Sequence, residues 1–142
     1  MQLTDPISPM LPEIGARATR SRTITETDVV LYGGLTGDQN PVHMNAEYAA
    51  TTPFGQRIAH GLLTAGLISA ILGNQLPGLG TIYLSQTLEF KAPVFIGDTI
   101  TAEVEVVAVR TERRIVTLRT ECRNQQGMCV LTGTAVVKVQ AP

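Results

Sequence analysis

The run GLLTAGLISAIL at residues 61–72 carries no charge and places apolar side chains on every side of a helical wheel. A helix that is apolar all round is a buried helix. Strand-like segments occupy residues 17–24, 81–91, 98–110, 113–123 and 128–139, and short turns join the last four. A buried helix needs apolar cover on more than one side. The pattern therefore predicts an α+β fold, with a five-stranded antiparallel sheet wrapped around a central helix at about residues 61–73.

The segment at residues 98–110 alternates as a strand with one buried face does. Its apolar positions are Ile100, Ala102, Val104, Val106 and Ala108, and its polar positions are Thr99, Thr101, Glu103 and Glu105. An open sheet of five such strands leaves edges that a second copy of the chain could close. We therefore expect a homodimer.

Length and composition fit one globular domain. The chain has 142 residues, of which 44% are hydrophobic and 16% charged. We expect a single domain over residues 1–142 with a loose segment at residues 1–16. Eleven basic and twelve acidic residues give a net charge of -1, which leaves no basic surface for a nucleic acid partner.

The first residues, MQLTDPISPMLPEIG, contain an aspartate, a glutamate and three prolines, unlike a secretory signal. Glycine and proline interrupt the nearly uncharged stretch at residues 60–87 well short of the ~20 apolar residues that a membrane span needs. We expect a cytoplasmic protein with no membrane partner. Cys122 and Cys129 are interpreted as half-buried strand residues with reduced thiols, and no Cys/His spacing predicts a metal site.

The segment at residues 25–60 is polar and too long for a simple connection, and long ordered loops are often functional. It contains Asp38, Asn40 and His43, on a stretch stiffened by Pro41. A carboxylate and an imidazole that converge on one small molecule can act as base and acid. The spacing alone also fits an ordinary turn, in which Asp38 caps the backbone and His43 is solvated.

Longer motifs favour the catalytic interpretation. The sequence YGGLTGDQNPVH at residues 32–43, YAA at 48–50 and IAHGLL at 58–63 closely resembles the MaoC-like (R)-specific enoyl-CoA hydratases, the hydratase-2 branch of the hot-dog fold. The resemblance continues through LPG at 76–78, FKAPV at 90–94 and GD at 97–98, and it covers residues 17–139.

The resemblance implies a hot-dog fold whose overhanging segment, about residues 25–60, carries the active site. It implies syn addition of water to a trans-2-enoyl-CoA, giving an (R)-3-hydroxyacyl-CoA, and a role in polyhydroxyalkanoate precursor supply. Asp38 would be the general base and His43 the proton donor to C2. Asn40 would orient the pair. Ser69 would be a further hydrogen-bond partner of the pair, or simply a small helix residue bonded to its preceding turn.

Elementary chemistry adds further expectations. Gly61 begins the buried helix, where unpaired backbone N–H groups can receive the thioester oxygen and a glycine allows close approach. Leu72 and Val136 are expected to form the floor of an acyl pocket for short chains, of about four to six carbons. His60 is interpreted as a packing or capping residue at the helix start. Two cations, Arg57 and Lys91, are candidates for the CoA phosphates.

Hydration changes no oxidation state, so we expect no metal or other cofactor, with CoA present only as part of the substrate. Other functions fit the same fold. An acyl-CoA thioesterase would direct water at the thioester carbonyl, but it would not need His43 to deliver a proton to C2. A non-catalytic acyl-thioester-binding subunit would need neither Asp38 nor His43. A dehydratase could run the reaction in reverse on a carrier-protein thioester.

Overall fold

The computed structural model describes residues 10–141, and an antiparallel sheet of six strands dominates it. The strands are β1 (Arg17–Thr23), β2 (Thr81–Gln86), β3 (Glu89–Phe90), β4 (Thr99–Arg110), β5 (Ile115–Arg123) and β6 (Cys129–Val139). Their order is β1-β4-β5-β6-β2, with the short β3 also paired to β6. Of the loose segment expected at residues 1–16, the structure describes residues 10–16. Residues 1–9 and residue 142 lie outside the described range.

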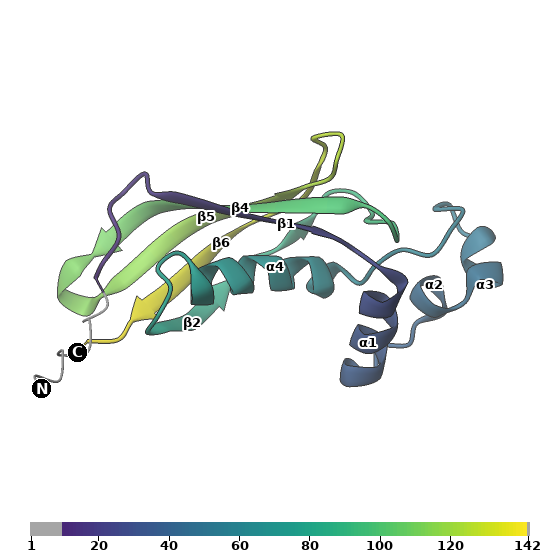
Figure 1. The fold of residues 1–142 in the computed structure, drawn as a ribbon, viewed down its shortest axis with the longest axis horizontal. Coiled ribbons are helices and arrows are strands. Elements are labelled where there is room, and N and C mark those ends of the chain that lie inside the picture. The colour runs from purple at the N-terminus through teal and green to yellow at the C-terminus, as the bar shows by residue number, and fades with distance from the viewer. Residues whose placement is uncertain (1–9, 142) are drawn as a thin grey trace, which may run out of the picture.

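The helices divide into a central one and a group beyond the end of the sheet. The helix α4 (Gly61–Asn74) lies under the curved sheet, whereas α1 (Glu26–Thr36), α2 (Pro41–Met44) and α3 (Ala46–Ala50) lie past its N-terminal end (Figure 1). This group is the overhang that the sequence predicts. No helix within residues 10–141 has the length and apolar character needed to cross a bilayer.

One face of α4 forms the core with the sheet. Its buried residues are Thr64, Leu67, Ile68, Ile71 and Leu72. The expected apolar cover on more than one side of the helix is incomplete in the single chain, because Leu62 is 57% exposed and Gly66, Ser69 and Gly73 follow it along the same exposed face. The curved sheet reaches only one side of the helix.

Strand β4 confirms most of the predicted alternation. Ile100, Ala102, Val104 and Val106 are fully buried. Ala108 is an exception and is exposed. A bulge between Val106 and Ala108 shifts the register with β5, which turns the remaining side chains to the other face.

The predicted strand at residues 81–91 is two strands, which is why the sheet has six strands instead of five. Strands β2 and β3 are separated at Thr87 and Leu88, opposite Gly133 of β6. A Cβ atom on Gly133 would overlap the carbonyl oxygen of Thr87, so this close approach depends on the missing side chain. Thr87 also bonds Thr134 twice, through its amide and its hydroxyl.

Local capping explains where α1 begins and ends. Thr25 and Asp28 form a capping box, in which each side chain accepts from the other's backbone amide. A hydrogen bond from Arg22 holds the pKa of Asp28 below its usual value. Gly37 ends the helix with φ 79°, a left-handed conformation that glycine adopts readily. The short helix α2, which the sequence analysis did not predict, begins after Asn40, whose side chain accepts from the Val42 amide.

We expect Gly133→Ala to lower the free energy of unfolding by about 1–3 kcal/mol, because the added methyl group must push β6 away from Thr87. Chemical denaturation followed by circular dichroism measures the change. Gly34→Ala is the matched control. Gly34 lies inside α1 with no atom near its missing Cβ, so alanine there is expected to stabilise by about 0.5–1 kcal/mol. Equal stability of the two variants would contradict this account of the break between β2 and β3.

Candidate active site

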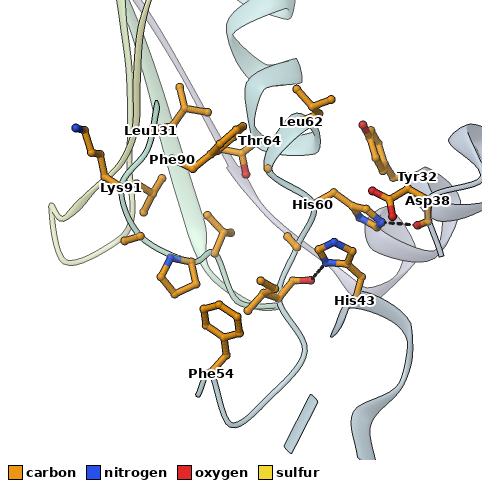
Figure 2. A pocket seen from close by; sticks show the side chains of 17 residues that line it. Tyr32, Asp38, His43, Phe54, His60, Leu62, Thr64, Phe90, Lys91 and Leu131 are labelled. Carbon is orange, nitrogen blue, oxygen red and sulfur yellow. Dashed lines mark hydrogen bonds between the residues drawn. The ribbon is translucent and has the colours of Figure 1, made fainter. Parts of the chain in front are cut away.

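A cavity of about 520 Å³ opens where the N-terminal end of α4 meets the overhang. Polar side chains gather on its overhang side, and apolar side chains from the sheet close its other side (Figure 2). The polar group on the overhang side comprises Tyr32, Asp38, His43 and His60, and the apolar group includes Val94, Val130 and Leu131. The cavity therefore joins a polar end to an apolar end.

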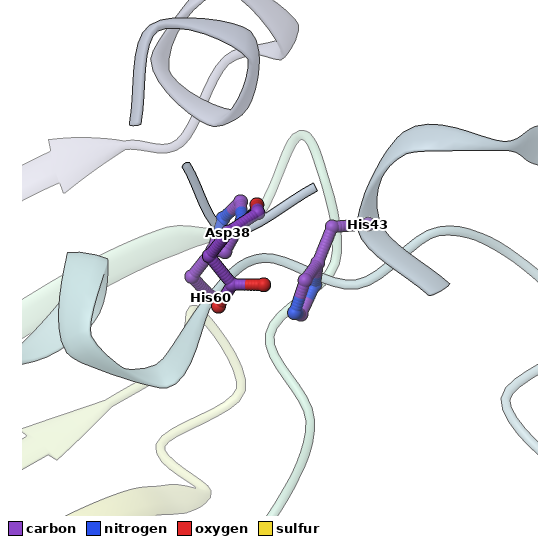
Figure 3. Close-up of side chains that lie close together, drawn as sticks. All are labelled: Asp38, His43 and His60. Carbon is purple, nitrogen blue, oxygen red and sulfur yellow. The ribbon is translucent and has the colours of Figure 1, made fainter. Parts of the chain in front are cut away.

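Asp38 stands at the turn that follows α1. Its amide bonds the Thr36 hydroxyl at 3.2 Å, and its carbonyl oxygen accepts from His60 Nε2 at 2.8 Å. The Asn40 amide approaches the carboxylate at 3.4 Å. These contacts fix the backbone of Asp38 and leave its carboxylate directed toward the His43 ring (Figure 3).

His43 lies on the short helix α2, and the segment before α4 holds it from behind. Its Nδ1 lies 2.7 Å from the carbonyl oxygen of Ile58. A carbonyl only accepts hydrogen bonds, so Nδ1 carries a proton and Nε2 is left for the cavity. Arg57 donates to the carbonyl oxygen of His43 at 2.6 Å and pairs with Glu26 at 2.7 Å. Arg57 thereby connects α1 to α2.

His60 occupies the position immediately before α4 and is 2% exposed. Its ring contacts the ring of His43, with 3.9 Å between centroids, and the ring of Tyr32, with 4.5 Å. One nitrogen of each histidine already faces a carbonyl oxygen. The three aromatic rings thus form a packed wall beside Asp38.

Asp38, His43 and His60 have donor atoms within 4.8 Å of one another, a set that by composition could hold a metal ion. The stacking works against this use. Imidazole binds a metal through a lone pair in the plane of its ring, and the planes of the two histidines lie only 30° apart at a centroid distance of 3.9 Å. Their lone pairs therefore run side by side instead of converging. The arrangement suits proton transfer between Asp38 and His43 better than ligation.

Gly61 is the first residue of α4 and lines the cavity. The amides of Leu63 and Thr64 bond the His60 carbonyl oxygen, whereas nothing in residues 10–141 accepts from the amides of Gly61 and Leu62. Such free amides, at the positive end of the helix dipole, suit an oxygen that gains negative charge. A Cβ on Gly61 would overlap the Phe90 ring, so the glycine also makes room for Phe90.

Comparison with known proteins identifies the fold and the family. The family model described as MaoC like domain matches residues 11–128. The chain belongs to the MaoC-like family. A solved structure titled as the (R)-hydratase from Aeromonas caviae involved in PHA biosynthesis superposes with a TM-score of 0.88. It is 47% identical, over 91% of this chain and 98% of that one.

Two curated MaoC-like relatives are about half identical to this chain. The (R)-specific enoyl-CoA hydratase of Rhodospirillum rubrum is 52% identical over 127 residues, which cover 89% of this chain and 88% of that protein. The 3-hydroxybutyryl-CoA dehydratase of Methylorubrum extorquens is 50% identical over 127 residues, covering 89% of this chain and 80% of that protein. The hot-dog fold and the family that the motifs predict are confirmed.

Within this MaoC-like site, the structure brings together Asp38, His43 and Gly61 of the predicted residues. Asn40 caps the helix that carries His43, and its carbonyl oxygen accepts from the His43 amide at 2.8 Å. Ser69 lies elsewhere, on the exposed face of α4, and lines a groove beside β2. It is therefore not placed to bond Asp38 or His43 within one chain.

The predicted pocket floor also requires correction. Leu72 is buried in the core, Val136 is half-buried on β6, and neither lines the cavity. Leu72 lies three turns along α4 from Gly61, about 16 Å away along the helix axis, and is too far away to reach the cavity. Val130 and Leu131 of β6 close the apolar end instead.

The two cations proposed for the CoA phosphates differ in their surroundings. Arg57 is occupied by His43 and Glu26, so its predicted phosphate role is not supported by its position. Lys91 lies at the rim of the cavity, where its ion pair with Glu89 raises the pKa of the Lys91 amine. Cys122 is buried, and burial raises the pKa of its thiol to about 12, which is unsuited to a nucleophile.

Sequence reasoning missed the contributions of Tyr32, His60, Thr64 and Phe90 to the cavity. His60 directly precedes Gly61, and Thr64 follows it by three residues, within one helical turn. This nearness to a predicted site residue was the signal in the sequence that could have placed both in the cavity. Thr64 has a buried hydroxyl without a partner in residues 10–141. Tyr32 and Phe90 come from segments that only the folded chain brings to the helix start.

The hydrogen bonds predict opposite tautomers for the two histidines. In the neutral forms, His43 should carry its proton on Nδ1, facing Ile58, and His60 should carry it on Nε2, facing Asp38. Long-range ¹H–¹⁵N correlation spectra of ¹⁵N-histidine-labelled protein at alkaline pH distinguish the four ring nitrogens. His60→Gln assigns the signals by removing one set. A neutral His43 protonated on Nε2 would contradict the geometry.

Proposed function

We propose that this MaoC-like protein is an (R)-specific enoyl-CoA hydratase, which adds water to a trans-2-enoyl-CoA and yields an (R)-3-hydroxyacyl-CoA. The observation that carries the proposal is the pairing of the Asp38 carboxylate with His43 across a cavity that has an apolar end. The half-identical relatives named as a hydratase and as a dehydratase of 3-hydroxyacyl-CoA support it.

In the proposed reaction, the Asp38 carboxylate removes a proton from a water molecule as the water oxygen attacks C3. His43 gives the proton on Nε2 to C2. Its Nδ1–H stays bonded to the Ile58 carbonyl oxygen, so the form that donates from Nε2 in this proposal is the imidazolium. Asp38 then returns its proton to His43, and both groups regain their starting states. Both groups act from one side of the double bond, which gives syn addition.

The thioester oxygen gains negative charge during the attack and needs a hydrogen-bond donor. The Gly61 amide at the start of α4 supports this role, with the Leu62 amide beside it. Loss of one such donor costs on the order of 3 kcal/mol in comparable sites. Addition of water to the double bond causes no net change of oxidation state. We therefore propose that neither a metal nor a redox cofactor takes part and that CoA enters only as part of the substrate.

Short acyl chains fit the cavity best. Its apolar end is formed by Val94, Val130 and Leu131, each of which is buried in the protein core. The acyl chain would have to displace core residues to extend further. The relative from Methylorubrum extorquens is named a 3-hydroxybutyryl-CoA dehydratase, after a four-carbon acyl group, which is consistent with this limit. Lys91, at the rim, is the proposed contact for a CoA phosphate, and polyhydroxyalkanoate precursor supply in the cytoplasm is the proposed role.

The purified protein should hydrate crotonyl-CoA. We expect the enoyl-thioester absorbance to fall without release of free thiol, and chiral analysis should identify (R)-3-hydroxybutyryl-CoA. Dodecenoyl-CoA should turn over more slowly. Release of thiol in the same assay would indicate the thioesterase instead. Activity confined to a crotonyl carrier-protein thioester would indicate the carrier-protein dehydratase.

Asp38→Asn and His43→Ala should each lower kcat by about 10²- to 10⁴-fold, because each removes a positioned base or acid. The melting temperature of Asp38→Asn should change little, since Asp38 is exposed, whereas His43→Ala also loses a ring contact and a hydrogen bond and should melt lower. Calorimetry should still detect binding of CoA thioesters to both folded variants. Full activity per folded molecule in both variants would contradict the assigned roles.

We also propose that the protein is a homodimer, joined through α4 and the edge strand β2. The exposed face of α4 and β2 line one groove, in which Leu62, Tyr83 and Leu84 expose 57%, 40% and 51% of their surfaces. Among residues 10–141, strand β2 pairs only with β6, which leaves its other edge open there. An apolar patch next to an open edge is typical of a surface covered by a partner.

Sedimentation should give twice the 15.2 kDa chain mass for the wild type. Leu84→Lys should shift the mass toward the monomer, because a lysine on an edge strand opposes pairing. Gln126→Lys adds the same charge in the exposed turn between β5 and β6 and should leave the dimer intact. A wild-type monomer at micromolar concentration would contradict the proposal.

A further inference from the structure

His60 is a buried histidine that the proposed reaction does not use as acid or base. We propose that it is a positioning residue, which holds the general base Asp38 at a fixed place relative to the Gly61 amide. This inference rests on the proposed hydratase function and deepens it. It assigns the orientation of the base to a hydrogen bond from a residue 22 positions away in the chain.

The hydrogen bond from His60 reaches the backbone of Asp38 and not its carboxylate. His60 Nε2 lies 2.8 Å from the Asp38 carbonyl oxygen, and because that oxygen only accepts, Nε2 is the donor. The Asp38 side chain therefore stays available to substrate while its backbone is anchored. Asp38 otherwise lies on an exposed turn whose remaining contacts come from Thr36 and Asn40, its own neighbours.

The surroundings of His60 Nδ1 indicate that the bond from His60 Nε2 to Asp38 is the reason for a histidine at this position. His60 Nδ1 is buried without a partner in residues 10–141. A buried polar atom without a partner costs free energy, which an apolar ring would avoid. The imidazole must therefore contribute something that an apolar ring cannot, and the bond to Asp38 is that contribution.

The backbone of His60 fixes the second half of the site. Its carbonyl oxygen accepts from the Leu63 and Thr64 amides and so begins α4, whose first amide belongs to Gly61. The preceding amide, of Ala59, bonds the Val94 carbonyl oxygen at 2.7 Å. His60 thus begins α4 through its own carbonyl oxygen, follows a residue bonded to the segment between β3 and β4, and bonds Asp38 through its side chain.

The His60 ring also supports the proton donor. It contacts the rings of Tyr32 and His43, which come from α1 and α2. One buried side chain therefore touches both members of the catalytic pair (Figure 2). Because catalysis depends steeply on geometry, a displacement of about 1 Å can lower the rate by ~100-fold.

Two variants separate the hydrogen bond from the rest of the side chain. In His60→Gln, the side-chain amide can place an N–H where Nε2 now lies. His60→Asn is one methylene shorter and leaves the Asp38 carbonyl oxygen without its donor. Both variants are polar and both lack the ring. His60→Phe keeps a ring for stacking but has no donor.

With crotonyl-CoA we expect His60→Asn and His60→Phe to lower kcat by about 10- to 100-fold, with KM within about threefold of the wild-type value. His60→Gln should recover kcat to within about tenfold of the wild type. Thr120→Val is the control for lost stability. Thr120 is buried on β5 away from the cavity and accepts from Gln86 Nε2, so its loss should lower the melting temperature and not kcat.

An active wild type in which His60→Asn and His60→Gln have equal kcat would overturn the positioning role. So would losses of activity that track only the folded fraction measured by circular dichroism. If His60→Phe does not fold, the comparison of the Gln and Asn variants still decides. A wild type inactive on every enoyl-CoA overturns the proposed function, and this inference with it.

Discussion

Burial of one apolar face of α4 against the curved sheet is the constraint on which the rest of the structure depends. Leu67, Ile68 and Ile71 fix the helix along its length. Its N-terminal end then lies at the margin of the sheet, where the first amides have no acceptor within the helix. The same packing that forms the core therefore delivers a polar helix end to the cavity.

The overhang is held to this core by the buried Val29 of α1 and by a few polar contacts. Arg57 and Ile58 bind His43 from one side, and His60 binds the Asp38 carbonyl from the other. All three residues belong to the segment that leads directly into α4. The acid–base pair is consequently positioned by the start of the buried helix, even though it lies on separate and largely exposed elements.

The charged residues of the sheet serve a different purpose. Arg119 pairs with Glu103 and Glu105 across β4 and β5, on the face opposite α4, and these pairs are partly exposed. Partly exposed pairs contribute little to stability. They keep the outer face polar while the inner face packs on the helix. Arg119, Glu103 and Glu105 do not line the catalytic cavity, whose charged and polar groups include Asp38, His43, the helix end and Lys91 at the rim.

The sequence by itself determined the elements and nominated the chemistry. Residues 61–72 predicted the helix through an uncharged apolar run, the alternation at residues 98–110 predicted a half-buried strand, and the motif around Asp38 and His43 predicted the family. These features are local, because periodicity, capping and short motifs act over a few neighbouring residues. They also predicted that a segment beyond the sheet carries the site.

Only the tertiary structure decided how distant residues meet. The break between β2 and β3 depends on the close approach of Thr87, which lies in the break, to Gly133 of β6. Leu72 lies in the core because of where α4 crosses the sheet. His60 became a partner of Asp38 through a contact across 22 positions, which no periodicity records. Such contacts depend on the distance and orientation of packed elements. A local pattern in the chain fixes neither.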